Sequence, residues 1–171
     1  LNSETGEEYI AEAGERIRAD ITWTNNLPTK ITNGEIEVRL GGSFDKSSVS
    51  VAKGFFRSLD STLVWNKTTN SELASISAGQ SGRVAFTFSP LDLSHLGSIK
   101  KPVVTVDVSA GGSRLSENNV AEEIESTVEK LVRISSGLLL NSRLLHFSSP
   151  LSNSGPFPPK ADNETTYTAV W

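Results

Sequence analysis

The sequence predicts an all-β protein, because three features typical of short antiparallel strands recur along its 171 residues. Apolar and polar residues alternate in successive runs, as they do when one face of a strand is buried and the other meets solvent. Pairs that favour turns separate these runs: Asn33-Gly34, Gly41-Gly42, Gly79-Gln80 and Gly111-Gly112. Helical periodicity is nearly absent, since only residues 120–130 resemble it and a Thr-Val step interrupts them.

The predicted strands follow one another along the chain. Residues 16–23 place isoleucines and Trp23 on one face and charged residues on the other, and residues 35–40 repeat that pattern. Further alternating runs occupy residues 83–88, 104–108 and 128–134. The side chains expected in the core are Ile17, Ile21, Trp23, Ile36, Val38, Val84, Phe86, Val104 and Val106. About seven or eight strands fit between residues 7 and 134, the number that an immunoglobulin-like antiparallel β-sandwich requires.

The chain divides into two parts of different character. Residues 1–134 are expected to form the immunoglobulin-like β-sandwich, and residues 135–171 to form a linker and the N-terminal strands of a second, incomplete repeat. Residues 148–160 are rich in Ser and Pro, and the run that ends at Trp171 follows a turn, as does the run that ends at Trp23. Position 1 is not methionine, so we expect the chain to be a piece of a longer protein.

Composition excludes several classes of function. The net charge of −4 argues against nucleic acid as a partner, since such binding needs a basic surface to neutralise phosphates. No apolar run approaches the roughly 18–20 residues of a membrane-spanning helix, so we expect no membrane span in this chain. The chain contains no cysteine, and it therefore has neither disulfides nor thiolate ligands for a metal.

A search for catalytic and metal-binding patterns assigns no catalytic, cofactor-binding or metal residue, and we expect a protein that is not an enzyme and needs no cofactor. Asp92, Ser94 and His95 are close in sequence, but residues so near to one another on a loop seldom form a triad, and a polar loop is the favoured interpretation. His146 alternates within an apolar run and is expected at a strand surface. No pair among the 20 acidic residues stands out as a pair for glycoside hydrolysis.

Two groups of oxygen-bearing side chains could be considered for calcium, although solvated loops are the favoured interpretation of both. The groups are Glu117, Asn118, Asn119, Glu122 and Glu123, and Asp162, Asn163 and Glu164. Two triplets, at residues 66–68 and 163–165, also fit the glycosylation sequon. Phe55, Phe56 and Trp65 bracket a loop-rich section, and exposed aromatic rings there would favour an alternative function, a carbohydrate-binding β-sandwich module.

Three segments together carry a resemblance to a known family. They are Trp23-Thr24-Asn25 at the end of an early strand, Glu-Ile-Glu-Val-Arg-Leu at 35–40, and Ala-Gly-Gln-Ser-Gly-Arg-Val-Ala-Phe-Thr-Phe at 78–88. These resemble the conserved-repeat, immunoglobulin-like domains of bacterial cell-surface and secreted proteins. Residues 91–101 and 117–129 depart from that pattern.

The resemblance implies a non-catalytic structural or interaction module, acting as a spacer, adhesive or assembly repeat, of an extracellular or cell-surface protein. It supplies no catalytic residues. The partners expected are neighbouring repeats or copies of the same chain, joined by strand addition, together with cell-surface or extracellular ligands.

Overall fold

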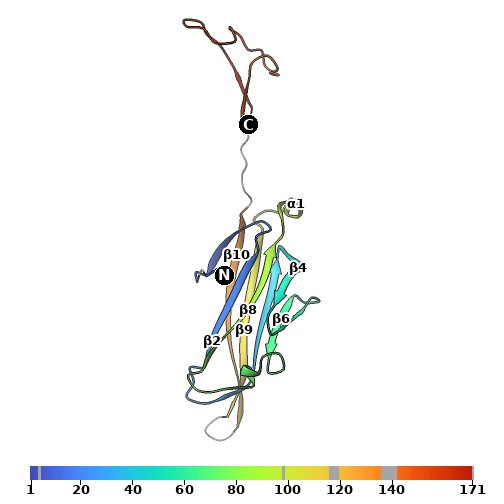
Figure 1. Ribbon diagram of the computed structural model, residues 1–171, viewed down its shortest axis with the longest axis vertical. Helices are drawn as coiled ribbons and strands as arrows, with labels where there is room; N and C mark the ends of the chain where they lie inside the picture. The colour runs from blue at the N-terminus through green and yellow to red at the C-terminus, as the bar shows by residue number, and fades with distance from the viewer. Residues whose placement is uncertain (4, 98, 116–119, 136–141, 171) are drawn as a thin grey trace. The chain divides into compact units, whose positions relative to one another are not determined.

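The computed structural model describes residues 1–3, 5–97, 99–115, 120–135 and 142–170 (Figure 1). The chain separates into two compact units, Leu1–Ser136 and Gly137–Trp171, which are described separately below. The strands of the first unit are β1 (Glu8–Glu12), β2 (Ile17–Thr24), β3 (Ile31–Gly42), β4 (Phe44–Val51), β5 (Phe55–Arg57), β6 (Thr62–Asn66), β7 (Ser75–Ile76), β8 (Ser81–Pro90), β9 (Val103–Leu115) and β10 (Ala121–Ser135). A 3-10 turn, η1 (Ser71–Ala74), and a single helical turn, α1 (Leu93–Leu96), complete the elements described in this unit.

The described strands of the first unit form a two-sheet sandwich, so the predicted all-β sandwich class is confirmed. The larger sheet has the order β1-β10-β9-β3-β6-β5, with β7 also paired to β3, and the smaller sheet has the order β2-β8-β4. In Figure 1 the smaller sheet lies over one face of the larger one. The pairing is antiparallel with one exception, because β1 runs parallel to β10. β1 is thus a parallel edge strand in an otherwise antiparallel set of described strands.

The core lies between the two sheets and is built from the period-two pattern. Seven of the nine predicted core side chains are buried: Ile17, Ile36, Val38, Val84, Phe86, Val104 and Val106. The other two, Ile21 and Trp23, are only partly buried and pack against the edge of the core. Both lie in the second half of β2, where the space between the sheets opens to solvent.

Two of the expected turns are parts of strands in the structure. Asn33-Gly34 forms a β-bulge inside β3, where the register with β9 shifts and Asn33 takes a left-handed φ of 52°. Gly111-Gly112 lies inside β9, between β3 and β10. A Cβ on Gly112 would lie 2.7 Å from Ile31 Cγ2, so glycine permits the close approach of β3. The turn expected at Gly79 is confirmed, with a φ of 75° between β7 and β8.

Residues 121–130, which gave the weak helical signal, belong to the long strand β10. β10 pairs with β9 from Ala121↔Leu115 to Arg133↔Val103. The second unit contains a small antiparallel pair of strands, β11 (Arg143–Leu145) and β12 (Thr168–Val170). Among the described residues, no helix is long and apolar enough to cross a membrane.

Candidate interaction site: the open side of the sandwich

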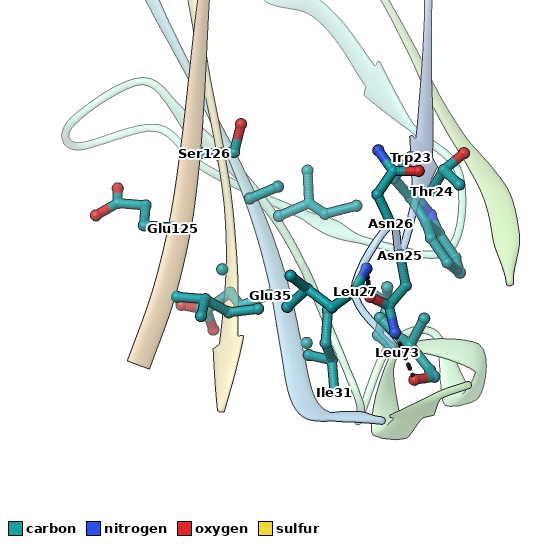
Figure 2. Close-up of a pocket in the computed structure, with 16 residues that line it drawn as sticks. Trp23, Thr24, Asn25, Asn26, Leu27, Ile31, Glu35, Leu73, Glu125 and Ser126 are labelled. Carbon is teal, nitrogen blue, oxygen red and sulfur yellow. Dashed lines mark hydrogen bonds between the residues drawn. The ribbon is translucent and has the colours of Figure 1, made fainter. Parts of the chain in front are cut away.

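The two sheets separate near the end of β2 and leave a groove with a volume of about 340 Å³ (Figure 2). Its walls come from β2 on one side and from β3, β9 and β10 on the other. The residues that line it are Trp23, Thr24, Asn25, Asn26, Leu27, Ile31, Gly34, Glu35, Ile36, Leu73, Ile76, Ala110, Gly111, Ile124, Glu125 and Ser126. Most of these side chains are apolar or small, so the groove suits an apolar side chain of a partner.

Trp23 forms the wall of the groove on the side of β2. Its indole ring lies over Gly82 of β8, at a distance that leaves no room for a Cβ on that residue. The indole Nε1 is buried and has no hydrogen-bond partner among the described residues. An unpaired buried donor costs about 1–3 kcal/mol of stability.

Asn25 fixes the loop that borders the groove after β2. The Asn25 side chain is buried, and its Nδ2 donates to the carbonyl oxygens of Thr29 (2.9 Å), Ile76 (3.2 Å) and Ser77 (3.1 Å). Its Oδ1 accepts from the backbone N–H of Leu27 at 3.0 Å. This network ties the loop after β2 to β7 and holds the groove in one shape. Sequence reasoning placed Asn25 in a motif but gave no hint of this role, because its partners are remote in sequence.

The groove opens beside the outer edge of β10. β1 covers that edge only from Leu131 to Ser135, and no other described strand pairs with it from Ala121 to Glu129. Side chains on the inner side of this open half are consequently exposed: Val128 is 64% exposed, and Ile124 and Ser126 border the groove. Figure 2 shows Ser126 and Glu125 on opposite sides of β10. An open strand edge next to an apolar groove is the surface that strand addition uses.

The other face of the open half is acidic. Glu123, Glu125 and Glu129 alternate along β10 and are exposed. Glu123 accepts a hydrogen bond from Ser113 Oγ at 2.8 Å, whereas Glu125 and Glu129 have no ion pair with any described residue. Glu129 lies directly across from Asp107 on β9, so two carboxylates face one another there.

The structure brings Asp92, Ser94 and His95 together, contrary to the expectation from sequence. Ser94 Oγ donates to Asp92 Oδ1 at 2.6 Å, and His95 Nδ1 lies 2.8 Å from the same oxygen. The reason is local: Asp92 is the N-cap of α1, and the turn folds the next residues back onto it. These hydrogen bonds, from Ser94 first, lower the pKa of Asp92 to about 2.

This cluster is a helix cap rather than a catalytic triad. In a triad the serine contacts one imidazole nitrogen and the carboxylate contacts the other. Here Ser94 and His95 Nδ1 both converge on Asp92 Oδ1, and Ser94 Oγ lies 3.3 Å from that same Nδ1. The serine therefore has no base positioned to accept its proton at Nε2.

Of the two groups considered for calcium, the first is described only at Glu122 and Glu123, and the second is described in full. Residues 117–119 lie outside the described part of the chain, while Glu122 forms an ion pair with Arg114 at 2.9 Å. Residues 162–164 are exposed in the second unit. Across the described ranges, no three His, Asp or Glu side chains are grouped closely enough to hold a metal ion.

The three aromatic residues considered for sugar stacking, Phe55, Phe56 and Trp65, do not form an exposed row. Trp65 is fully buried and donates from Nε1 to the Ala52 carbonyl at 2.9 Å, and Phe56 packs against the core. Phe55 alone of the three is exposed. Residue type and spacing could not show this, because Trp65 faces inward on a strand flanked by β3 and β5.

Exposed aromatic rings instead gather in the second unit. The His146 ring lies 4.6 Å from Phe147, 5.6 Å from Phe157 and 5.5 Å from Tyr167, measured between ring centroids. His146 Nδ1 lies 3.0 Å from the Thr166 carbonyl. Phe147 is 82% exposed and Phe157 58% exposed, so this cluster presents ring surface to solvent.

Comparison with solved structures found a distant structural likeness. No protein-family model matches the chain, and no curated protein matches it. A solved structure described as a novel type I cohesin–dockerin complex from Clostridium thermocellum includes a chain with a similar arrangement, at a TM-score of 0.39 and 11% identity. The match covers 75% of this chain and 90% of that chain. At such a TM-score and identity, nothing about function follows from the likeness.

Proposed function

We propose that this chain is a non-catalytic interaction module of an extracellular or cell-surface protein, and that it takes an extended segment of a protein partner on the open side of its sandwich. One observation carries the proposal: the outer edge of β10 from Ala121 to Glu129, which no described strand pairs with, lies beside an apolar groove walled by Trp23. The edge offers backbone hydrogen bonds, and the groove offers a place for the alternate side chains of an added strand.

The chemistry of the groove supports a binding role over a catalytic one. Its only ionisable lining residues in the described part of the chain are Glu35 and Glu125. No described histidine or lysine lines the groove to act with them as an acid or a base. The immunoglobulin-like resemblance of residues 23–25, 35–40 and 78–88 favours the same role and an extracellular location.

The same proposal covers the organisation of the chain. Residues 1–134 serve as the module, and residues 135–171 as a linker with the first strands of a second, incomplete repeat. The short pair β11–β12 is too small to be stable alone in water, which is what the beginning of a further β domain would look like.

The test is a search for peptides that occupy the groove. A phage-displayed library of ten-residue peptides is panned against the wild-type protein and against Ser126→Trp, in which an indole would fill the groove. Ser50→Trp is the matched control, because Ser50 is an exposed residue of β4 that does not line the groove. We expect enriched peptides that bind wild type and S50W and lose at least tenfold in affinity for S126W. The proposal is contradicted if no peptide is enriched, or if the enriched peptides bind S126W as tightly as the wild type.

A second candidate function, carbohydrate binding, is favoured by one observation in the second unit. Phe157 and Tyr167 have ring centroids 6.5 Å apart in a T-shaped arrangement, and both keep exposed ring surface beside Phe147. Exposed rings stack on the apolar faces of sugars. Affinity electrophoresis against soluble β-glucans, xylans and chitosan tests this function. Retardation that is lost in Phe147→Ala supports it, and unretarded migration in every polysaccharide contradicts it.

A further inference from the structure

We infer that the partner segment is an extended strand in which basic and apolar side chains alternate, and that it pairs with the outer edge of β10 over residues 123–129. This inference rests on the proposed function, since it specifies the partner of the same site. It is drawn from three features of β10. These are the direction of its backbone groups, the pairing of β1 with residues 131–135 (the covered half), and the charges on residues 121–129 (the open half).

The backbone of β10 presents every second residue to the open edge. The N–H of Leu131 donates outward to the Glu7 carbonyl at 3.2 Å, and the N–H of Ile134 donates inward to the Pro102 carbonyl at 3.0 Å. Because N–H and C=O directions alternate along a strand, odd-numbered residues face the outer edge and even-numbered residues face β9. Glu123, Glu125, Thr127 and Glu129 therefore direct their N–H and C=O groups to the open edge.

The covered half of β10 shows how a strand is held at this edge. β1 pairs with residues 131–135 and buries Tyr9 and Ala11 against the core. On the other face, Glu8 of β1 forms a bidentate ion pair with Arg133 of β10, at 2.8 and 2.7 Å. An acidic residue on the added strand thus meets a basic residue on β10. The inward side chains supply apolar contact.

The open half carries the opposite charge. Its outward-facing side chains Glu123, Glu125 and Glu129 would meet the outward-facing side chains of an added strand, so basic residues at those positions are favoured. The inward positions of that strand would lie beside Ile124, Ser126 and Val128 and reach toward Trp23. Apolar residues are favoured there, because they cover ring and aliphatic surface that is now exposed.

A second copy of β10 is a poor occupant of the same edge. Two such edges paired with each other would bring the glutamates at 123, 125 and 129 of each strand together, and like charges across strands are destabilising. The occupant is therefore a basic strand of a different protein. Self-association of the intact protein, abolished by Glu125→Lys, would overturn this assignment.

The experiment uses a labelled peptide with blocked ends, Lys-Val-Lys-Val-Lys-Val-Lys, and its counterpart with glutamate at every lysine position. Fluorescence anisotropy with the full chain should give at least tenfold tighter binding of the lysine peptide. The double variant E125K/E129K should reverse that preference. The matched control E72K/E164K changes the net charge equally at exposed residues that are not part of β10, and it should keep the wild-type preference. Equal binding of both peptides to the wild type overturns the inference.

Backbone pairing is tested separately from charge. Methylation of the peptide nitrogens that face β10 should lower affinity at least tenfold, whereas methylation of the alternate nitrogens should change it less than threefold. Thr127→Pro should abolish binding while keeping the β9–β10 ladder, because the Thr127 N–H points to the open edge. Should T127P fail to fold, the methylated peptides still decide the question. A peptide of alternating lysine and serine that binds as tightly as the lysine–valine peptide overturns the role of the groove.

The two proposals fail in different ways. If the library yields S126W-sensitive peptides without alternating basic residues, the inference is wrong and the proposed function stands. If neither the library nor the lysine peptide gives binding that S126W weakens, both are wrong.

Discussion

The two halves of β10 share one strand and one alternation, yet their inward side chains meet different surroundings. Val132 and Ile134 in the second half are buried, whereas Val128, which has the same parity, is 64% exposed. The difference comes from the neighbours: β1 covers the edge from Leu131 onward, and no described strand covers it before that residue. An alternating sequence thus fixes which side of a strand faces inward, while the adjoining strands decide whether that side is buried.

The largest expected effect is a difference in unfolding free energy between the same substitution in the two halves of β10. Val132→Asp should cost about 4 kcal/mol or more of unfolding free energy, because it buries an uncompensated charge. Val128→Asp, with the same chemistry on the same face, should change it by less than about 0.5 kcal/mol. Urea unfolding followed by circular dichroism measures both. Similar losses for the two variants would mean that Val128 is covered in solution.

A second contrast compares the tryptophan of the groove with that of the core. Trp65→Ala should cost about 3–5 kcal/mol, the usual range for a fully buried large aromatic. Trp23→Ala should cost about 2 kcal/mol, because the ring is only partly buried and its Nε1 has no partner among the described residues to lose. Chemical denaturation gives both values. A greater loss for W23A than for W65A would show that the groove is closed in solution.

A third experiment weakens the pairing of β1 with residues 131–135 of β10, so that this half of the edge becomes less protected. Hydrogen bonds from Arg133 lower the pKa of Glu8 below its usual value. The Glu8–Arg133 contribution is therefore complete above the unfolded-state pKa of Glu8 and is lost as the pH falls through the lower, folded-state value. Hydrogen exchange of the amides of β1 and of residues 131–135 should accelerate, relative to the intrinsic rate, as the pH falls from about 6 to about 3.

Glu8→Gln should remove most of that pH dependence and should raise exchange at pH 7 toward the level of the open half. Glu7→Gln is the control, since the contact that Glu7 makes to Leu131 uses its backbone carbonyl. Equal exchange in the wild type and E8Q at both pH values would contradict a role for this ion pair in holding β1.

Sequence patterns predicted the sandwich well where the inner face of a strand is covered. The alternations around Ile17, Ile36, Val84 and Val104 identified both the strands and the buried side. They were less informative for β10, where Ile124 and Val128 are four residues apart with only polar residues between them, a spacing that also suits a helix. Only the pairing of β10 with β9 shows that this segment is a strand rather than a helix.

The candidate site lay beyond the reach of sequence reasoning for a related reason. A groove exists where two sheets part, and an open edge exists where a neighbouring strand ends. Both features depend on how separate segments are arranged, so the pattern of a single segment does not predict them. The Trp23 ring was correctly assigned to the inner face of its strand, but its contact with Gly82 and its exposure to the groove depend on β8 and β10. Likewise, Asp92 meets Ser94 and His95 only because a single helical turn follows Asp92.

The smallest expected effect concerns the carboxylates that face one another across β9 and β10. Glu129→Lys places a cation across from Asp107, so it should stabilise the fold by a few tenths of a kcal/mol at low salt. Glu125→Lys is the matched control, because Gly111 lies across from it and offers no side chain. Thermal unfolding at low and high salt measures both, and an equal gain in the two variants would assign the effect to net charge.

The effect of E129K on stability can be compared with its effect on peptide binding. If Glu129 is kept for a basic partner strand, E129K should bind the lysine–valine peptide several-fold less tightly while it unfolds at a higher temperature than the wild type. Stability and binding would then move in opposite directions at one residue, which is the behaviour expected of a charge retained for recognition at some cost in stability. If E129K gains stability and keeps its affinity, Glu129 contributes nothing to recognition, and the charge complementarity must come from Glu123 and Glu125 alone.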